Sequence, residues 1–369
     1  MKTLTNLKFM LLVGLAINLT GCDFLQNENI KNEGKWSQVG ASFDNIIYDV
    51  KSDSKGKIYV SGADLKNISV WDGVSWSRLG NVSETFNGGV YWPITIDNND
   101  NVYAVGRISV PQANSEYHVA KFNVSTKKWI NLTSNGPLFD NGIHSIVTDL
   151  QGNVYVAGNV AYLPSVQKGN YIYKWDGNTW TMLGGTKLPP SEFVKMHVDT
   201  SGNLFASFYN DNISPCVSKW NGSSWDELGG KNNSNFGTGQ IYCINSDSKG
   251  NIYAGGYFVL GDSAFNLNKW TKETNKNSEF YTFESSLDVK SIAFDSADTL
   301  YVAGSFTNLK NQYYIAKYHP DRKLWSNYWD LNVNNKINSI CFDPNGNLYA
   351  GGEFTNKDNK YYVAVYKKR

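Results

Sequence analysis

A seven-bladed β-propeller, an all-β fold, is the architecture that this sequence of 369 residues predicts, and three observations support it. A ten-residue core unit recurs seven times, with its leading Asp at intervals of 44 to 52 residues. Each copy holds four short segments with the composition of antiparallel strands, separated by turn residues. The copies fill residues 34–369 at about 48 residues each, the length of a four-stranded propeller blade.

The core unit opens with an Asp-x-x-Gly-Asn turn and continues into an apolar strand. Its copies are DSKGKIYVSG (53–62), DNNDNVYAVG (97–106), DLQGNVYVAG (149–158), DTSGNLFASF (199–208), DSKGNIYAGG (247–256), DSADTLYVAG (295–304) and DPNGNLYAGG (343–352). The Asp carboxylate can accept backbone N–H groups, and Gly supplies a positive φ. Copies two and six carry Asp100 and Asp298 in the Gly position, where Asp is a tolerated left-handed residue. Seven-fold recurrence in turns favours a structural role for the leading Asp over an array of calcium sites.

Aromatic residues mark the two outer strands of each copy. We expect the third strand to end at Trp71, Phe122, Trp175, Trp220, Trp270, Tyr318 and Tyr366. We expect the fourth strand to carry Trp76, Trp129, Trp180, Trp225 and Trp325, with Phe280 in that position in the fifth copy. The strands read apolar on both sides, which fits blades that each pack between two neighbours.

The string GKWSQVG (34–40) resembles the end of the other copies, such as VSWSRLG (74–80), yet it stands at the start of the repeat region. At the other end, YYVAVYKKR (361–369) stops after a third strand. We therefore expect the N-terminal strand to complete the last blade. Such a closure leaves neither terminal blade with an open edge.

The Asp–Gly–Asn turns resemble the NHL and kelch-like propeller repeats. The WDGxxWxxLG tail of the copies is similar to bacterial kelch-like repeats of the delta-60 kind. The resemblance covers residues 34–369 and implies a β-propeller. It implies no single activity, because one fold hosts many functions.

The first residues predict a signal peptide over residues 1–21. Lys2 and Lys8 precede an apolar run at 9–17 that is too short to span a bilayer. Removal of this segment changes the formal charge from +1 to −1. A near-neutral chain with no basic run has no electrostatic footprint for nucleic acid, so we expect no nucleic-acid partner.

The tetrapeptide LTGC (19–22) resembles the bacterial lipobox, and the resemblance implies that Cys22 carries a lipid. An ordinary secretory signal with a chance Cys is the alternative. Residues 22–33 then form a flexible tether, and the lipid is the one expected membrane contact. Asp23 favours the periplasmic face of the inner membrane in a Gram-negative cell, with the outer membrane or cell surface as the other locations in the cell envelope.

Three cysteines remain after the lipobox, namely Cys216, Cys243 and Cys341. None has the CxxC spacing of a metal or redox site, and each lies in an apolar, strand-like run. We expect buried free thiols, with one disulfide plus one free thiol as the alternative. No motif requires a cofactor, and we expect a monomer.

The repeat also predicts which face of the ring binds. The repeated turns emerge on one face, whereas the variable connections, such as 107–117, 159–171 and 257–265, emerge on the other. Variable loops on a rigid scaffold commonly carry binding sites. Five residues before each Asp, at the mouth of the innermost strand on this variable face, stand Tyr48, Trp92, His144, Val194, Tyr242, Lys290 and Asn338. This mixed ring suits a sugar, a peptide or an aromatic ligand, and the alternative is packing between blades.

Catalytic motifs are weak. The sequence holds no Ser nucleophile elbow, phosphate loop or zinc motif. His144 and His197 lie in adjacent innermost strands, but at different depths and without a carboxylate column, so we expect structural histidines and no metal. The sequence therefore favours a non-catalytic platform that binds an envelope protein or glycan over an enzyme. A metal-assisted hydrolase or lyase at the channel mouth is the alternative.

Overall fold

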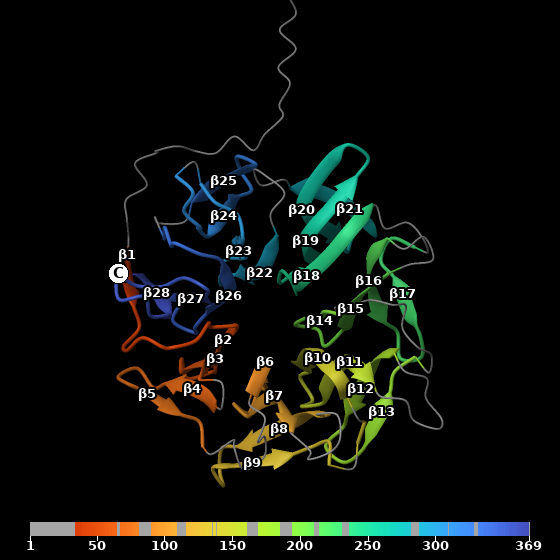
Figure 1. Ribbon diagram of the computed structural model, residues 1–369. Helices are drawn as coiled ribbons and strands as arrows, with labels where there is room; N and C mark the ends of the chain where they lie inside the picture. The colour runs from red at the N-terminus through yellow and green to blue at the C-terminus, as the bar shows by residue number, and fades with distance from the viewer. Residues whose placement is uncertain are drawn as a thin grey trace, which may run out of the picture.

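The computed structural model describes residues 34–64, 67–80, 90–108, 116–134, 136, 137, 139–160, 169–184, 194–209, 214–230, 236–281, 288–308, 310–327 and 331–368. These residues form 28 strands and no helix. The strands make seven blades of four antiparallel strands each, arranged in a ring (Figure 1). The predicted seven-bladed β-propeller is confirmed.

Each blade runs outward from the axis of the ring. The innermost strands are β2 (Asp49–Ser52), β6 (Val90–Ile96), β10 (Phe139–Thr148), β14 (Met196–Val198), β18 (Thr238–Ser246), β22 (Val289–Phe294) and β26 (Ile337–Phe342). The second strands are β3 (Ile58–Asp64), β7 (Val102–Ile108), β11 (Val154–Val160), β15 (Leu204–Tyr209), β19 (Ile252–Leu260), β23 (Leu300–Gly304) and β27 (Leu348–Gly352). The third strands are β4 (Asn67–Trp71), β8 (Glu116–Asn123), β12 (Gly169–Trp175), β16 (Pro215–Trp220), β20 (Ser263–Thr271), β24 (Ala316–His319) and β28 (Ala364–Lys368). The outer strands are β5 (Trp76–Arg78), β9 (Lys128–Asn131), β13 (Trp180–Met182), β17 (Trp225–Glu227), β21 (Lys276–Tyr281), β25 (Leu324–Asn327) and β1 (Gly34–Gln38).

The N-terminal strand closes the ring. β1 pairs antiparallel with β28, so that Trp36 lies opposite Tyr366, and the order in this sheet is β1-β28-β27-β26. The last blade thus takes its outer strand from the start of the repeat region, as predicted (Figure 1). The closure removes the unpaired edge that β28 would otherwise present.

The hydrophobic core is divided among the seams between blades. The described residues form seven buried clusters, each built from two neighbouring blades. At the seam of the last and first blades, for example, Ile47 and Val50 pack with Tyr349 and Val365. Because both faces of a blade are buried in this way, its strands carry apolar residues at successive positions.

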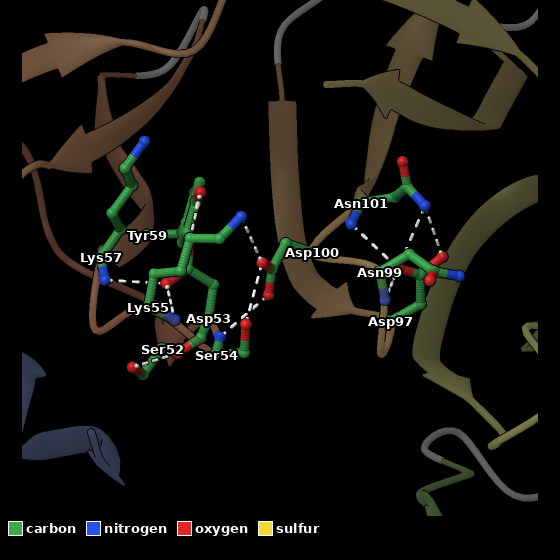
Figure 2. A network of polar contacts seen from close by, with 10 residues as sticks. All are labelled: Ser52, Asp53, Ser54, Lys55, Lys57, Tyr59, Asp97, Asn99, Asp100 and Asn101. Carbon is green, nitrogen blue, oxygen red and sulfur yellow. Dashed lines mark hydrogen bonds and ion pairs between the residues drawn. The ribbon is translucent and has the colours of Figure 1, made fainter. Parts of the chain in front are cut away.

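The Asp that opens each core unit holds its own turn together. Asp53 Oδ1 accepts the backbone N–H groups of Lys55 and Lys57 at 2.9 and 2.8 Å, and Oδ2 accepts the hydroxyl of Tyr59 at 3.0 Å (Figure 2). The two backbone bonds recur in all seven blades, at Asp97, Asp149, Asp199, Asp247, Asp295 and Asp343. This is the structural role that the sequence predicted for the recurring Asp.

Two blades replace the turn Gly with Asp, and both substitutions adopt the expected left-handed conformation. The φ of Asp100 is 61° and that of Asp298 is 60°. Each carboxylate also crosses to the preceding blade, where Asp100 binds Ser54 and Asp298 binds Ser248. The two receiving turns share the sequence DSKG, so the exceptions to the Gly rule are links between blades.

The outer-strand tryptophans join consecutive blades. In blades 1 to 3, the indole N–H donates to the carbonyl of the residue three positions after the aromatic of the preceding outer strand. The pairs are Trp76–Val39 at 2.7 Å, Trp129–Leu79 at 2.7 Å and Trp180–Leu132 at 2.8 Å. A Cβ on Gly40, whose φ is +56°, would lie 2.5 Å from the Trp71 ring. The WxxLG tail therefore provides an acceptor and a side-chain-free surface for the next blade.

The outer strand of the fifth blade has no Trp opposite the last aromatic of the third strand, and its register differs from the predicted one. Trp270 lies opposite Asn277, whereas Phe280 lies opposite Asn268. The prediction of Phe280 in the Trp position is therefore wrong. The turn-closing pair of Thr271 and Lys276 fixes the register and places Asn277 where blades 2 and 6 have Trp.

Candidate functional site

Most innermost strands contain a β-bulge at the position five residues before the Asp. In β18 the register shifts between Ile241 and Cys243, so Tyr242 lies outside the residue-by-residue pairing with β19. The same shift occurs at His144, Lys290 and Asn338 in β10, β22 and β26. A β-bulge bends a strand and re-aims a side chain, and bulges are common beside functional sites. The bulges therefore take these four residues out of the regular pairing with the second strand of each blade.

The last Gly of the core unit makes room for the bulge. A Cβ on Gly256 would lie 1.9 Å from the carbonyl oxygen of Gln240, and a Cβ on Gly352 would lie 2.1 Å from that of Lys336. Blade 4 has Phe208 at this position, and its strands β14 and β15 pair without a register shift. The recurring final Gly was thus a signal in the sequence for the bulge, and sequence reasoning missed it.

The structure brings part of the predicted ring together. Lys290 Nζ lies 3.5 Å from Asn338 Oδ1, and Asn338 Nδ2 donates to the carbonyl of Ile47 at 3.1 Å. The predicted ring members Tyr48, His144, Tyr242, Lys290 and Asn338 are each partly buried. These five side chains are therefore neither filler in the core nor fully exposed.

Two predicted members of the ring stand apart from this group. Val194 is fully buried, and it packs in the cluster between blades 3 and 4. The interpretation as packing between blades therefore holds at this position. Trp92 lies within a register shift of β6, between Tyr91 and Ile94, but its side chain lies outside the described residues.

One residue further along the innermost strands, polar side chains of blades 1, 3, 6 and 7 connect neighbouring blades. Ser145 Oγ accepts the N–H of Met196 at 3.0 Å, and Ser291 Oγ accepts that of Ile340 at 3.1 Å. At the closing seam, Ser339 Oγ accepts the N–H of Val50 at 3.1 Å and donates to Asp49 Oδ1 at 2.9 Å. These hydrogen bonds explain why Ser or Asp occupies this level in four of the seven blades.

Lys195 occupies the same level in blade 4 and cannot accept a hydrogen bond. Its Nζ instead donates to the backbone carbonyl of His144 in blade 3 at 3.2 Å. No carboxylate forms an ion pair with this ammonium within the described ranges. Burial lowers the pKa of Lys195. The nearby Cys243 and Asp49 act to raise this pKa, whereas the positive charges of Lys51 and Lys290 lower it further.

The partner of Lys51 distinguishes it from Lys195. Lys51 Nζ lies 2.9 Å from Asp49 Oδ1, in the same strand. Burial acts to lower the pKa of Lys51, but the Asp49 carboxylate outweighs it, and the pKa is raised. Lys51 is therefore a compensated cation, and Lys195 is not.

A second charged group lies beside the bulge of blade 6. Burial lowers the pKa of Lys290; Glu353 and Asp288 oppose the change, and Lys336 adds to it. Burial likewise raises the pKa of Asp288, against the effect of Lys290 and Lys336. Burial also raises the pKa of Tyr242, with Asp288 contributing. Titratable side chains from blades 5 and 6 therefore influence one another beside these two bulges.

The two histidines of the innermost strands do not form a common site in the described geometry. His197 Nε2 lies 2.8 Å from Ser246 Oγ in blade 5, whereas His144 belongs to the bulge of blade 3. Burial lowers the pKa of each histidine to about 4, and Lys195 adds to the effect at His144. Across the described ranges, no group of three or more His, Cys, Asp or Glu side chains is arranged to hold a metal ion.

The three cysteines are free thiols, as expected. Cys216 is buried, whereas Cys243 and Cys341, which lie in innermost strands, are partly buried. Burial raises the pKa of all three to about 12. A thiol with a raised pKa is protonated and weakly reactive at neutral pH.

Residues 1–33, which include Cys22 and Asp23, lie outside the described residues. The variable segment 161–168, with its Pro, lies outside them as well. Of the part of the chain that is described, no stretch forms a helix that is long and apolar enough to cross a membrane.

No protein-family model matches this chain, and no curated protein sequence matches it. Solved structures do match it in fold. The extracellular domain of BT4673 from B. thetaiotaomicron, described as a hybrid two-component system, superposes with a TM-score of 0.62 at 14% identity. The match covers 90% of this chain and 39% of that one, so the chain spans about two fifths of this neighbour.

Two further structures match over nearly their whole length. Virginiamycin B lyase from Staphylococcus aureus has a TM-score of 0.62 at 12% identity, over 90% of this chain and 99% of the lyase. YCF48 bound to D1 peptide has a TM-score of 0.57 at 12% identity, over 96% of this chain and 100% of YCF48. At such identities the similarity establishes the β-propeller fold, and the resemblance to NHL, kelch-like and delta-60 repeats stays a prediction.

Proposed function

We propose that this chain is a lipid-anchored platform of the bacterial cell envelope, which binds a protein or a glycan through the variable face of its propeller. The bulged positions Tyr242, His144, Lys290 and Asn338 carry the proposal. They lie on four innermost strands, at positions that the β-bulges take out of the regular pairing. On the opposite face, the seven Asp side chains are occupied by hydrogen bonds within their own turns. A specific site is therefore easier to build on the variable face.

Two structural neighbours support a binding role by analogy of fold. One is an extracellular domain, and the other, YCF48, was solved with a bound peptide. A propeller that binds a protein segment in the cell envelope agrees with both. The likeness is one of fold alone, so the partner has to be found by experiment.

Cross-linking in cells followed by partner identification tests the platform. We expect Tyr242→Ala to weaken capture of the partner by about tenfold or more, because aromatic anchors often contribute about 2 kcal/mol to binding. Trp92→Ala should act in the same direction. Asn178→Ala and Ser223→Ala, in the turns of the opposite face, are the matched controls and should leave capture unchanged. If a bound partner instead protects the Asp turns from labelling, the partner binds the opposite face and the proposed binding face is wrong.

The anchor requires its own test. We infer that Cys22 carries the lipid and that residues 23–33 tether the propeller to the membrane, with Asp23 favouring the inner membrane in a Gram-negative cell. Cys22→Ser should release the protein from sedimented membranes into the soluble fraction. Unchanged sedimentation of this variant would overturn the anchor and leave the binding face unaffected.

The alternative of a metal-assisted hydrolase or lyase at the axis stays a prediction of the sequence. Metal analysis of the purified full chain distinguishes it from the platform. A stoichiometric divalent ion that is lost in His144→Ala would favour the enzyme.

A further inference from the structure

We propose that the seam between blades 4 and 5 contains a binding site for one water molecule, which takes the position of an indole in other blades and joins the Asn268 amide to the backbone carbonyl of Leu228. The inference is independent of the proposed binding at the variable face, because it concerns the contact between two blades.

The outer strand of blade 5 lacks the indole that joins other blades. In blade 2, Trp129 donates its indole N–H to the carbonyl of Leu79 in blade 1 at 2.7 Å. In blade 5, Asn277 lies opposite Trp270, at the position that Trp129 has opposite Phe122. Blade 5 therefore has an Asn where blade 2 has the Trp that reaches the preceding blade.

The acceptor for such an indole is nevertheless in place in blade 4. Leu228 stands three positions after Trp225, as Leu79 stands three positions after Trp76. The N–H of Leu228 donates to the carbonyl of Val217 at 2.9 Å, and the N–H of Leu79 is held by the same kind of bond in blade 1. Within the described ranges, no donor meets the Leu228 carbonyl. The seam therefore keeps the acceptor without its usual donor.

A small pocket lies in this part of the seam. Seven residues of the two blades and their connection line it, namely Val217, Leu228, Phe236, Ile252, Ala254, Asn268 and Trp270. Its volume is about 10 Å³, which is about the room that the centre of one water molecule needs. The pocket is thus of the size for a water molecule and too small for an aromatic side chain.

Two side chains that line the pocket carry N–H groups without an acceptor. Asn268 is 1% exposed, and its Nδ2 has no hydrogen-bond partner in the described part of the chain. The same is true of the buried Nε1 of Trp270. A buried donor without an acceptor is unfavourable. A water molecule could accept from both groups and donate to the Leu228 carbonyl, which gives it the three hydrogen bonds typical of a buried water.

Asn268 is itself an exception within the repeat. Two positions before the last aromatic of the third strand, the other blades have Ser69, Ala120, Tyr173, Ser218, Ala316 and Ala364. The one blade with Asn at this position is also the one blade without a Trp in its outer strand. The two exceptions are explained together if an amide and a water molecule replace the indole.

A crystal structure of the purified full chain that resolves ordered water tests the site. We expect one water molecule within hydrogen-bond distance of the Asn268 amide, the Trp270 indole N–H and the Leu228 carbonyl. We expect this water to be lost in Asn268→Leu, which keeps the size of the side chain and removes its polar group. A dry pocket in the wild type, or a water that keeps its place in Asn268→Leu, would overturn the proposal.

Thermal unfolding of the full chain tests the same site in solution. Asn277→Trp combined with Asn268→Ala gives blade 5 the residue pair of blade 2, and we expect the unfolding temperature to rise by roughly 2 °C, because the new indole replaces the water at the Leu228 carbonyl. Asn268→Ala alone should lower it, since the change enlarges the pocket. Asn178→Ala, in an exposed turn of blade 3, is the matched control and should be additive with Asn277→Trp. If the double variant does not fold, the crystallographic comparison decides. Additive effects of the changes at 268 and 277 would show that the two positions share no site, and would overturn the proposal.

Discussion

Asp100 in blade 2 accepts two hydrogen bonds from Ser54 in blade 1, one from its backbone N–H at 2.9 Å and one from its hydroxyl at 2.9 Å. Lys55 Nζ lies 3.1 Å from the same carboxylate (Figure 2). The residue that departs from the Gly consensus of its own turn is thus the residue that holds the preceding turn. The same relationship recurs between Asp298 and Ser248.

We predict that Asp100 and Ser54 are energetically coupled. Asp100→Asn keeps a residue that tolerates positive φ but removes the charge, and Ser54→Ala removes the hydroxyl donor. Urea unfolding of the two single variants and the double variant should give a coupling energy of about 1 kcal/mol. Additive effects of the two changes would show that the contact contributes nothing to stability.

The lowered pKa of the Asp100 carboxylate predicts that the stability of the fold decreases at acidic pH. Burial acts to raise the pKa of Asp100, but the bonds from Ser54 and Lys55 outweigh it, and the pKa is lowered from 3.8. Its contribution to stability is therefore complete above pH 3.8 and is lost as the pH falls through the lowered value. Acid unfolding of Asp100→Asn should lack this step, and an unchanged acid transition would contradict the assignment.

The indole hydrogen bonds predict that Trp129 and Trp225, which occupy equivalent positions in two blades, contribute differently to stability. Trp129 donates to the Leu79 carbonyl at 2.7 Å, whereas the buried Nε1 of Trp225 has no acceptor within the described part of the chain. Trp129→Phe should therefore lower the free energy of unfolding by about 1 kcal/mol more than Trp225→Phe does. Urea unfolding of the pair measures this difference, and equal losses would mean that the indole bond does not join the blades.

The closing strand predicts a large loss of stability on truncation. Deletion of residues 34–40 exposes the edge of β28 and removes Val39, which is buried at the seam of blades 7 and 1. We expect the free energy of unfolding to fall by roughly 3 kcal/mol or more. Deletion of residues 23–33 is the control and should leave the unfolding transition unchanged. A 34–40 deletion that unfolds like the parent protein would contradict the closure.

His144 and His197 predict a weakening of the fold in mild acid. Their pKa values of about 4 lie below the value of 6.5 expected in an unfolded chain. Between these two values the unfolded chain binds protons that the folded chain does not, so stability falls as the pH drops from 6.5 to 4 and then levels off. After allowance for partial exposure, the loss is about 2 kcal/mol per histidine. The double variant His144→Asn, His197→Asn should flatten this slope in urea unfolding measured at several pH values, and an undiminished slope would assign it to other groups.

The sequence predicted which positions of the repeat contribute to the candidate site, but not how their side chains are arranged. The residues five before each Asp could be found by counting, and the structure places five of them within β-bulges. Lys195 was missed because it is adjacent to the counted position, and Val194 was counted in its place. The sequence signal was available, since Lys195 is the only Lys among the seven residues found four before the Asp. Its meaning depends on neighbours from other blades, which the repeat alone does not reveal.

The repeat by itself determined the number of blades, the order of strands within a blade and the closure by residues 34–38, because turn chemistry and strand periodicity act over a few residues. The register of blade 5 was decided by a four-residue turn that brought Asn277 and not Phe280 opposite Trp270. The links from Asp100 to Ser54 and from Trp76 to Val39 join residues about one blade apart. The hydrogen bond from Lys195 to the carbonyl of His144 likewise joins two neighbouring blades. Such contacts depend on distances across the ring, and only the tertiary structure fixes those distances.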